Sequence, residues 1–205
     1  RLVASIPNTS TTKTNQPACL TNSTGLVDCG NWSVSASWAV PSTAVSGIYI
    51  ARLVGEAGGV GASHVVFVVR QDGGTSAVFF QTSDTTWQAY NTYGGNSVYT
   101  GAPAGRAYKV SYNRPFTTRC CEYPGGSSRS WLFNAEYPMV RWLESNGYDV
   151  AYISGVDSHR AGALLRNHNV FLSVGHDEYW SGGQRTNVTA ARDAGVHLAF
   201  FSGNE

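Results

Sequence analysis

Three consecutive residues carry the clearest chemical potential in this chain. His176, Asp177 and Glu178 follow a short apolar run at residues 170–174. A run of this kind predicts a buried strand, and Gly175 allows the backbone to turn sharply after it. In open α/β sheets, ligands bind just past the carboxyl ends of the strands. An imidazole and two carboxylates at such a place could ligate a metal ion or transfer protons.

A structural role for these residues stays open. Asp177 could cap the helix that the sequence predicts from Ser181 and accept hydrogen bonds from loop amides. That is the more common role of an aspartate at such a turn. For His176 and Glu178, the position at a strand end supports a direct chemical role equally well.

A second candidate segment, residues 86–95, is rich in aromatic and amide side chains. It follows the first strand of the predicted α/β part, so it should lie at the same sheet edge as Glu178. A phenol from Tyr90 or Tyr93 could then point into the same cleft, and a phenolate is a hard oxygen ligand suited to ferric iron. The alternative is an aromatic loop that packs over the sheet.

Two charged residues allow both functional and structural interpretations. Arg114 could bind a carboxylate through two hydrogen bonds, or it could be a surface arginine before the turn residue Pro115. Glu136 lies in the first turn of a predicted helix, where a negative charge is favourable. The chain has no Gly-x-Ser-x-Gly nucleophile motif. No helix is predicted after the glycine-rich residues 55–61, so a phosphate-binding loop is not expected.

The elements that position these residues fall into two predicted parts. Residues 1–70 contain β-type segments separated by turn residues, which predicts a β-rich, sandwich-like segment. From residue 75 onward, strands alternate with helices, which predicts an α/β domain over residues 75–205 with a parallel, three-layer α/β/α sheet. We expect this domain to be truncated at its C-terminus, because the chain ends just past a strand.

The predicted segments can be placed along the sequence. Strands are expected at 32–38, 47–54, 65–69, 77–80, 148–153, 170–174 and 197–201. Helices are expected from Asn134 to Asn146, from Asp157 or Ser158 to Leu165, and from Ser181 to Asp193. Residues 82–105 are predicted to form a long loop.

Composition excludes some functions and indicates others. The 205 residues carry a net charge of +1 with 13% charged residues, and no basic stripe is present, which argues against nucleic-acid binding. No apolar stretch is long enough to span a bilayer. Abundant Gly, Ser and Thr with few Lys indicate a secreted protein. Cys19 and Cys29 are expected to form a disulfide, whereas the pairing of Cys120 and Cys121 stays open.

Four Asn-x-Ser/Thr sequons occur, and they would mark surface loops if the host glycosylates secreted proteins. They are at Asn8, Asn22, Asn31 and Asn187.

Several motifs in one order carry a family resemblance. They include Trp-Gln-Ala-Tyr-Asn at 87–91, Arg-Pro at 114–115, Glu-Tyr-Pro at 136–138, Gly-His-Asp-Glu-Tyr-Trp at 175–180 and Phe-Phe-Ser-Gly-Asn at 200–204. Over roughly residues 45–205 the chain resembles the large (β) subunit of N,N-dimethylformamidase and its secreted homologues. The resemblance implies a β-rich region followed by a glutamine-amidotransferase-like, flavodoxin-like α/β domain.

The resemblance also implies a mononuclear iron site in an amidohydrolase that acts on non-peptide C–N bonds. Glu178 matches the glutamate ligand, His176 a catalytic histidine beside the metal, and Tyr90 one of two tyrosine ligands. For the other tyrosine, Tyr137 is the first choice, with Tyr112 behind it. Iron would activate water or the amide carbonyl of a small-molecule substrate as a Lewis acid.

One feature of the family lies outside this chain. The family uses a further acidic residue downstream, beyond residue 205, so we expect further domains in a longer chain. The competing hypothesis is a non-catalytic secreted surface or binding module with an aromatic cleft. The enzyme is expected to bind its substrate with Trp87, Tyr93 and Trp180, and the binding module would use the same three residues together with Tyr90.

Overall fold

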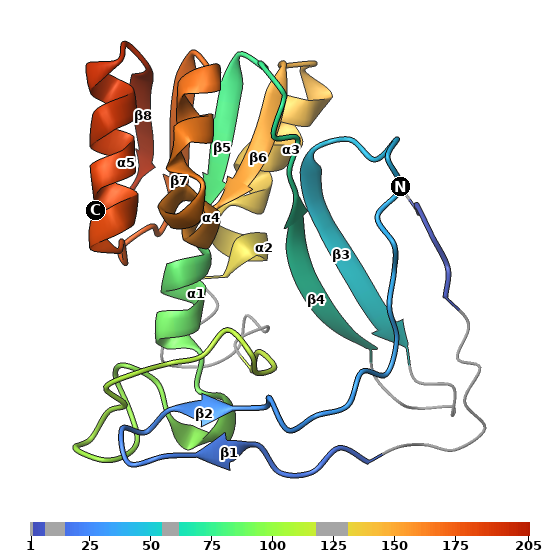
Figure 1. Ribbon diagram of the computed structural model, residues 1–205, viewed down its shortest axis with the longest axis vertical. Helices are drawn as coiled ribbons and strands as arrows, with labels where there is room; N and C mark the ends of the chain where they lie inside the picture. Colours follow the sequence, from blue (N-terminus) through green and yellow to red (C-terminus); the bar gives the residue numbers. More distant parts are fainter. Residues whose placement is uncertain (1, 7–14, 55–61, 118–130) are drawn as a thin grey trace.

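The computed structural model describes residues 2–6, 15–54, 62–117 and 131–205. Its centre is a four-stranded parallel sheet with the strand order β6-β5-β7-β8 (Figure 1). The strands are β5 (Val78–Thr82), β6 (Val150–Ser154), β7 (Val170–Gly175) and β8 (His197–Ser202). Their nearly continuous apolar sequences suit strands that are covered on both faces. The predicted α/β class is therefore confirmed.

Successive residues of each strand face opposite layers, as strand geometry requires. On one face, Phe79, Ile153 and Phe171 pack in one buried cluster with Val188 and Ala191 of α5 (Gly182–Asp193). The 3-10 helix η3 (Gly162–Asn167) covers the same face. Each fully buried Phe or Ile side chain contributes roughly 2 kcal/mol.

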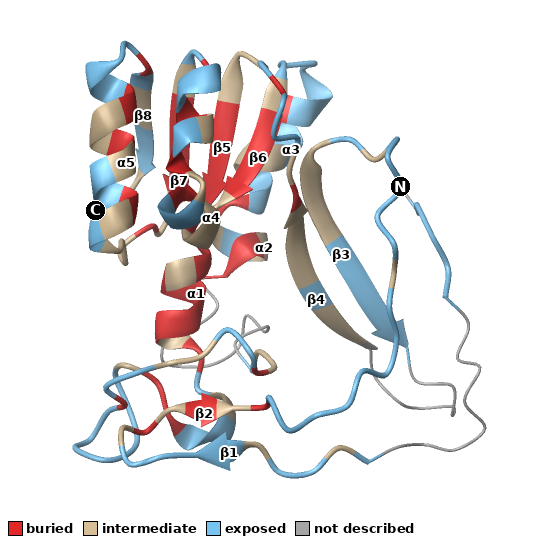
Figure 2. Cartoon of the chain, viewed as in Figure 1, coloured by how far each residue is buried: buried red, intermediate tan, exposed pale blue. Residues whose placement is uncertain are grey.

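The opposite face of the sheet forms a second cluster. Phe80, Tyr152 and Leu172 pack there with Leu143 of α3 (Tyr137–Ser145). A long hairpin completes this layer: β3 (Gly47–Val54) pairs antiparallel with β4 (Ala62–Val69). Burial is concentrated in β5, β6 and β7, while much of the hairpin is exposed (Figure 2).

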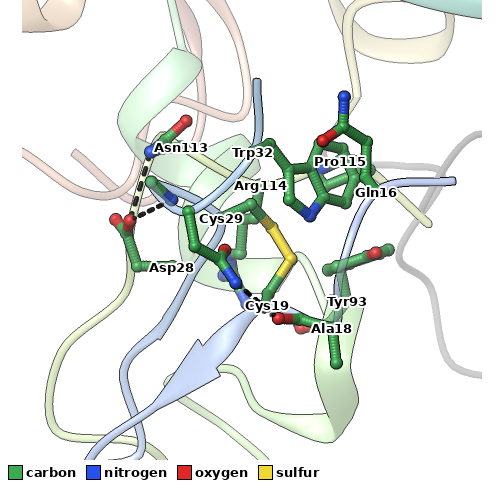
Figure 3. Close-up of a disulfide and its surroundings, with 12 residues drawn as sticks. Gln16, Ala18, Cys19, Asp28, Cys29, Trp32, Tyr93, Asn113, Arg114 and Pro115 are labelled. Atoms are coloured by element: carbon green, nitrogen blue, oxygen red, sulfur yellow. Dashed lines mark hydrogen bonds between the residues drawn. A yellow bond between two sulfur atoms is a disulfide. The ribbon is translucent and has the colours of Figure 1, made fainter. Parts of the chain in front are cut away.

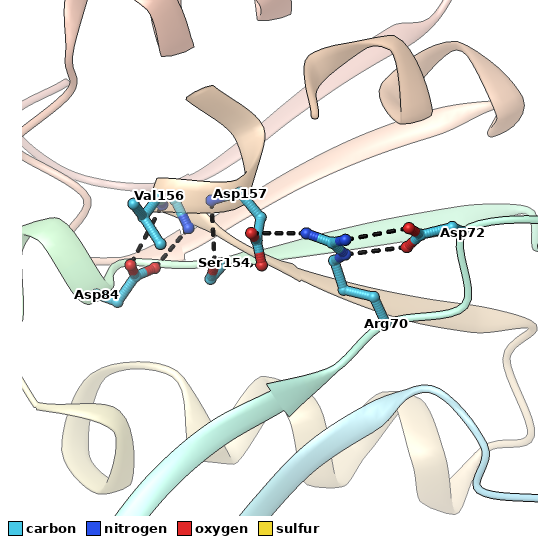
Figure 4. A network of polar contacts seen from close by, with 7 residues as sticks. Arg70, Asp72, Asp84, Ser154, Val156 and Asp157 are labelled. Atoms are coloured by element: carbon cyan, nitrogen blue, oxygen red, sulfur yellow. Dashed lines mark hydrogen bonds and ion pairs between the residues drawn. The ribbon is translucent and has the colours of Figure 1, made fainter. Parts of the chain in front are cut away.

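An ion-pair network joins the hairpin to the parallel sheet. Arg70, directly after β4, lies 2.9 Å from Asp72 and 2.6 Å from Asp157 of α4 (Gly155–Arg160). Ser154 caps α4 by accepting a hydrogen bond from the Asp157 amide, and Asp84 accepts one from the amide of Val156 (Figure 4). The start of α4 is therefore anchored from both sides.

Helices α4 and α5 are joined through one asparagine. The Nδ2 atom of Asn187 donates to the carbonyl of Ser158 at 2.8 Å and to that of His159 at 3.0 Å. Gly162 packs against the same amide, because a Cβ atom at Gly162 would lie 2.2 Å from Nδ2. The side chain of Asn187 is therefore tightly packed between two helices.

Near the N-terminus, β1 (Leu20–Thr21) and β2 (Val27–Asp28) form a short antiparallel pair. The Cys19–Cys29 disulfide closes it, as expected (Figure 3). Cys120 and Cys121 lie outside the described residues. Among the described residues, no helix is long and apolar enough to cross a membrane.

Several predicted elements differ from the structure. Residues 32–38 form no strand, and Val34 is 85% exposed, since none of the described strands pairs with them. Within the predicted loop 82–105, α1 (Asp84–Tyr90) and the 3-10 helix η1 (Tyr93–Gly95) form. Asn134 does not cap α3, because it lies inside α2 (Leu132–Ala135).

The cap predicted for α4 is also wrong. Ser154, not Asp157 or Ser158, caps this helix, because the chain enters it directly from β6. The division at residues 70–75 stays a prediction.

Candidate functional site

Strand order brings the two candidate segments together. β5 and β7 are parallel neighbours, so the residues that follow them emerge at the same edge of the sheet. α1 follows β5, and the segment 175–180 follows β7. The hydroxyl of Ser83 donates to the carbonyl of Val174 at 3.2 Å, and the amide of Tyr179 donates to the hydroxyl of Thr86 at 3.1 Å. These bonds fasten the two segments to each other.

Gly175 is required where it stands. Its φ is +90°, a conformation that side chains disfavour, and a Cβ atom would lie 2.7 Å from the carbonyl oxygen of Ala135. Close approach to α2 therefore leaves no space for a larger residue. The turn delivers His176 and Glu178 to the carboxyl edge of the sheet.

Glu178 is the centre of a cluster of hydroxyl and imidazole groups. The Tyr90 hydroxyl donates to Glu178 Oε2 at 2.8 Å, and the Tyr99 hydroxyl lies 3.3 Å from both carboxylate oxygens. His176 Nε2 is 3.1 Å from Glu178 Oε2 and 3.3 Å from the Asn204 side-chain nitrogen. The Tyr90 and Tyr99 rings stack, with centroids 4.5 Å apart. We call these four residues, Tyr90, Tyr99, His176 and Glu178, the Glu178 cluster.

Sequence reasoning places Tyr90, His176 and Glu178 near one another but misses Tyr99 and Tyr179. The Tyr179 hydroxyl donates to the Tyr99 hydroxyl at 2.6 Å. Burial raises the pKa of Tyr99 to about 12, so its phenol keeps its proton at neutral pH unless a cation displaces it. Tyr99 lies in an irregular loop, where no periodicity indicates which side chain turns toward the sheet.

The disulfide-closed β1–β2 pair supports this loop from the other side. The Asn96 side chain donates to the carbonyl of Gly25 at 2.9 Å, and the amide of Tyr108 donates to that of Thr24 at 2.8 Å. Asp28 accepts a hydrogen bond from Asn113 at 3.1 Å (Figure 3). The position of Tyr99 therefore depends on residues that precede it by about 70 positions.

Arg114 matches neither interpretation of the sequence. It is only 6% exposed, and its guanidinium donates to four carbonyl oxygens, those of Gln88, Tyr93, Asn96 and Ser111. Burial lowers its pKa to about 10. Arg114 therefore ties the end of α1 to the loop that carries Tyr99, and among the described residues it binds no carboxylate.

The proposed second tyrosine ligands lie elsewhere. Tyr137 is 40% exposed on α3, and its ring packs against Phe133 with centroids 5.9 Å apart. The Tyr112 hydroxyl donates to Asp84 at 2.7 Å. Neither interaction involves Glu178.

The three aromatic residues expected to bind ligand have different surroundings. Trp87 is buried, and its indole donates to Glu136 at 2.7 Å. Trp180 packs edge-on against Phe171 in the core. Tyr93 lies near the disulfide (Figure 3), and its carbonyl accepts from Arg114.

Trp180 and Tyr179 both line an open groove with a volume of about 260 Å³. Its other polar lining residues are Thr85, Gln88, Tyr112 and Ser181.

Two carboxylates beneath the edge are fully buried and hold the segments in place. Glu136 accepts from the Trp87 indole and, at 3.3 Å, from the Ser83 amide. Asp177 accepts from Gln81 at 2.7 Å and from Ser173 at 2.9 Å. Burial raises the pKa of Glu136 well above its usual range and that of Asp177 to about 7. The expected capping role of Asp177 is wrong, because Ser181 caps α5.

The donor set of the Glu178 cluster fits a hard cation. In the part of the chain that the structure describes, no group of three or more His, Cys, Asp or Glu side chains could share a metal ion. A metal at Glu178 would therefore need the phenol oxygens of Tyr90 and Tyr99 in addition to the carboxylate. Phenolate and carboxylate oxygens together suit ferric iron.

Two curated relatives match part of this chain. The N,N-dimethylformamidase beta subunit of Paracoccus aminophilus is 33% identical over 89 residues, which are 42% of this chain and 12% of the relative. The N,N-dimethylformamidase beta subunit of Alcaligenes sp is 31% identical over 90 residues, 43% of this chain and 12% of the relative. The matched stretch is thus a small part of both relatives. The family described as "N,N-dimethylformamidase beta subunit-like, C-terminal" matches residues 1–205, and this chain belongs to that family.

Proposed function

We propose that this chain is the α/β part of a secreted, iron-dependent hydrolase of small amides, similar to N,N-dimethylformamidase. The observation that carries the proposal is the meeting of Tyr90, Tyr99 and His176 on one carboxylate, Glu178. Membership of the family supports the same assignment. The names of the two curated relatives supply the substrate class.

Glu178 and Tyr90 would hold the iron, and we propose Tyr99 as the second tyrosine ligand in place of Tyr137. Tyr99 is already within 3.3 Å of Glu178, whereas the Tyr137 ring contacts Phe133 on α3. When bound, ferric iron supplies Lewis-acid activation of water or of the amide carbonyl.

The chain's own residues would orient the substrate and handle protons. His176 Nε2, at 3.1 Å from Glu178, would accept a proton from an attacking water or return one to the departing amine. The open groove beside Tyr179 is lined by neutral side chains, none of which belongs to the Glu178 cluster.

The first test is elemental analysis of the purified chain with a visible absorption spectrum. We expect near-stoichiometric iron and a tyrosinate-to-iron charge-transfer band. Glu178→Gln should lose most of the iron while far-UV circular dichroism stays unchanged. Full iron content in that variant would refute the ligand assignment.

A wild-type chain that stays free of iron after reconstitution would instead favour the non-catalytic binding module. Amide hydrolysis should then be assayed in a longer chain, because the matched stretch is only 12% of each relative.

A further inference from the structure

We propose that Tyr179 is a positioning residue, whose hydroxyl fixes the phenol oxygen of Tyr99 beside Glu178. The inference deepens the proposed function and rests on it for its iron-bound readout. The contact itself belongs to the metal-free chain and can be measured there.

A directed chain of hydrogen bonds leads from Tyr179 to Glu178. The Tyr179 hydroxyl donates to the Tyr99 oxygen at 2.6 Å, and the Tyr99 hydroxyl points to both oxygens of Glu178 at 3.3 Å. The Tyr179 ring stands nearly perpendicular to the rings of Tyr90 and Tyr99, at 81° and 86°. It therefore contacts the edges of the stacked pair.

The direction of the Tyr179 bond matters if Tyr99 binds a cation as a phenolate. Tyr99 then has no proton to donate to Glu178, so that bond is lost. The bond from Tyr179 is kept, because Tyr99 is the acceptor in it. It also becomes stronger, since a hydrogen bond to a charged acceptor is roughly twice as strong as a neutral one. Such outer contacts orient a metal ligand and tune its electronic character.

Helix α1 forms hydrogen bonds to both the amide and the carbonyl of Tyr179. Its amide donates to the Thr86 hydroxyl at 3.1 Å, and its carbonyl accepts from the Thr85 hydroxyl. Thr86 is fully buried. The same helix ends at Tyr90, so α1 places both Tyr90 and the residue that holds Tyr99.

The ring and the hydroxyl of Tyr179 can be tested separately. The ring forms part of the groove wall, whereas the hydroxyl contacts Tyr99. Tyr179→Phe removes only the hydroxyl and leaves the wall in place. It is therefore the informative substitution.

The metal-free test is a double-mutant cycle on the unfolding equilibrium with Tyr179→Phe and Tyr99→Phe. A direct hydroxyl contact predicts a coupling of about two- to five-fold in the unfolding constant. The control cycle replaces Tyr179→Phe by Tyr148→Phe. Tyr148 packs against Trp142 before β6, at the opposite end of the sheet. The effects of Tyr148→Phe and Tyr99→Phe on the free energy of unfolding should therefore be additive. Additivity in the Tyr179 cycle would overturn the proposal.

The iron-bound test compares charge-transfer spectra. Tyr179→Phe should keep its iron, while the tyrosinate band moves to longer wavelength, because a phenolate that loses a hydrogen bond donates electrons more readily. Tyr148→Phe should leave the band unchanged. An unshifted band in iron-loaded Tyr179→Phe would overturn the proposal. A wild-type chain that takes up no iron would count against the proposed function, and the double-mutant cycle alone would then decide the role of Tyr179.

Discussion

The Tyr99 hydroxyl lies 3.3 Å from each carboxylate oxygen of Glu178, although 79 positions separate the two residues in the chain. Tyr90, 88 positions from Glu178, approaches the same carboxylate at 2.8 Å. Two phenols thus meet one carboxylate at the edge where β5 and β7 end. This arrangement makes the choice of the second tyrosine ligand testable.

Tyr99→Phe should weaken iron binding by more than about 100-fold, because loss of outer contacts alone costs about 10- to 100-fold. Tyr137→Phe is the matched control and should keep the wild-type affinity. Iron content after dialysis against graded chelator measures both. The reverse outcome, in which only Tyr137→Phe loses iron, would restore Tyr137 as the ligand.

Arg114→Met should destabilise the fold by about 3 kcal/mol, since it removes a charged donor and leaves buried carbonyl oxygens unpaired. The same change at Arg192 serves as control, because that side chain is 59% exposed and pairs with its neighbour Asp193. Urea unfolding of both variants measures the difference. Equal stability losses at the two positions would contradict the role assigned to Arg114.

Stability should depend on the protonation of His168. This residue is 4% exposed, its ring stacks on Phe79 at 3.9 Å, and Nδ1 is 2.8 Å from the carbonyl of Ser76. Burial lowers its pKa from the usual 6.5. The unfolded chain therefore binds more protons than the folded chain just below pH 6.5, and the stabilisation from neutral His168 is lost as the pH falls through that range.

The test is His168→Asn, which keeps a donor for Ser76 but does not titrate. As the pH falls from 7.5 to 5.5, the difference in the free energy of unfolding between wild type and variant should become smaller. Urea unfolding measures this difference. A constant difference for His168→Asn would show that His168 does not contribute to the pH dependence.

Replacement of Cys19 and Cys29 by Ser should lower stability by about 2–3 kcal/mol, the value expected for a loop of this size. The effect should extend to the Tyr99 loop, because the β1–β2 pair supports it through Gly25 and Thr24. Hydrogen exchange of the amides of Ala107 and Tyr108 should speed up, while β7 amides stay protected in native conditions. Unchanged exchange at both loop amides would contradict this support.

Local sequence signals predict the elements that have a clear residue pattern. The strand at residues 47–54 and the helix after Ser181 have the predicted bounds. Helix α1 was missed because Thr85, Thr86 and Tyr90 have modest helix propensity. Tertiary bonds hold it instead, including those from Trp87 to Glu136 and from Arg114 to Gln88. By contrast, residues 32–38 alternate like a strand, but no strand in the described part of the chain pairs with them.

The candidate site also has one part that the sequence predicts and another that it does not. The meeting of Tyr90 with Glu178 follows from strand order, because both come just after neighbouring parallel strands. Tyr99 could not be predicted, since its position depends on a loop that Arg114 and the β1–β2 pair fold together. Arg114 itself looked like a surface residue because sequence does not show how many carbonyl oxygens a loop turns inward.

The tight packing around Asn187 has a consequence for glycosylation. Asn187 belongs to a sequon, and its Nδ2 atom, which would carry the sugar, already donates to Ser158 and His159 against Gly162. A glycan on this nitrogen would leave α5 unable to pack on α4. In a glycosylating host, attachment at Asn187 and completion of this helix pair are therefore mutually exclusive, and the folded protein should carry no sugar there.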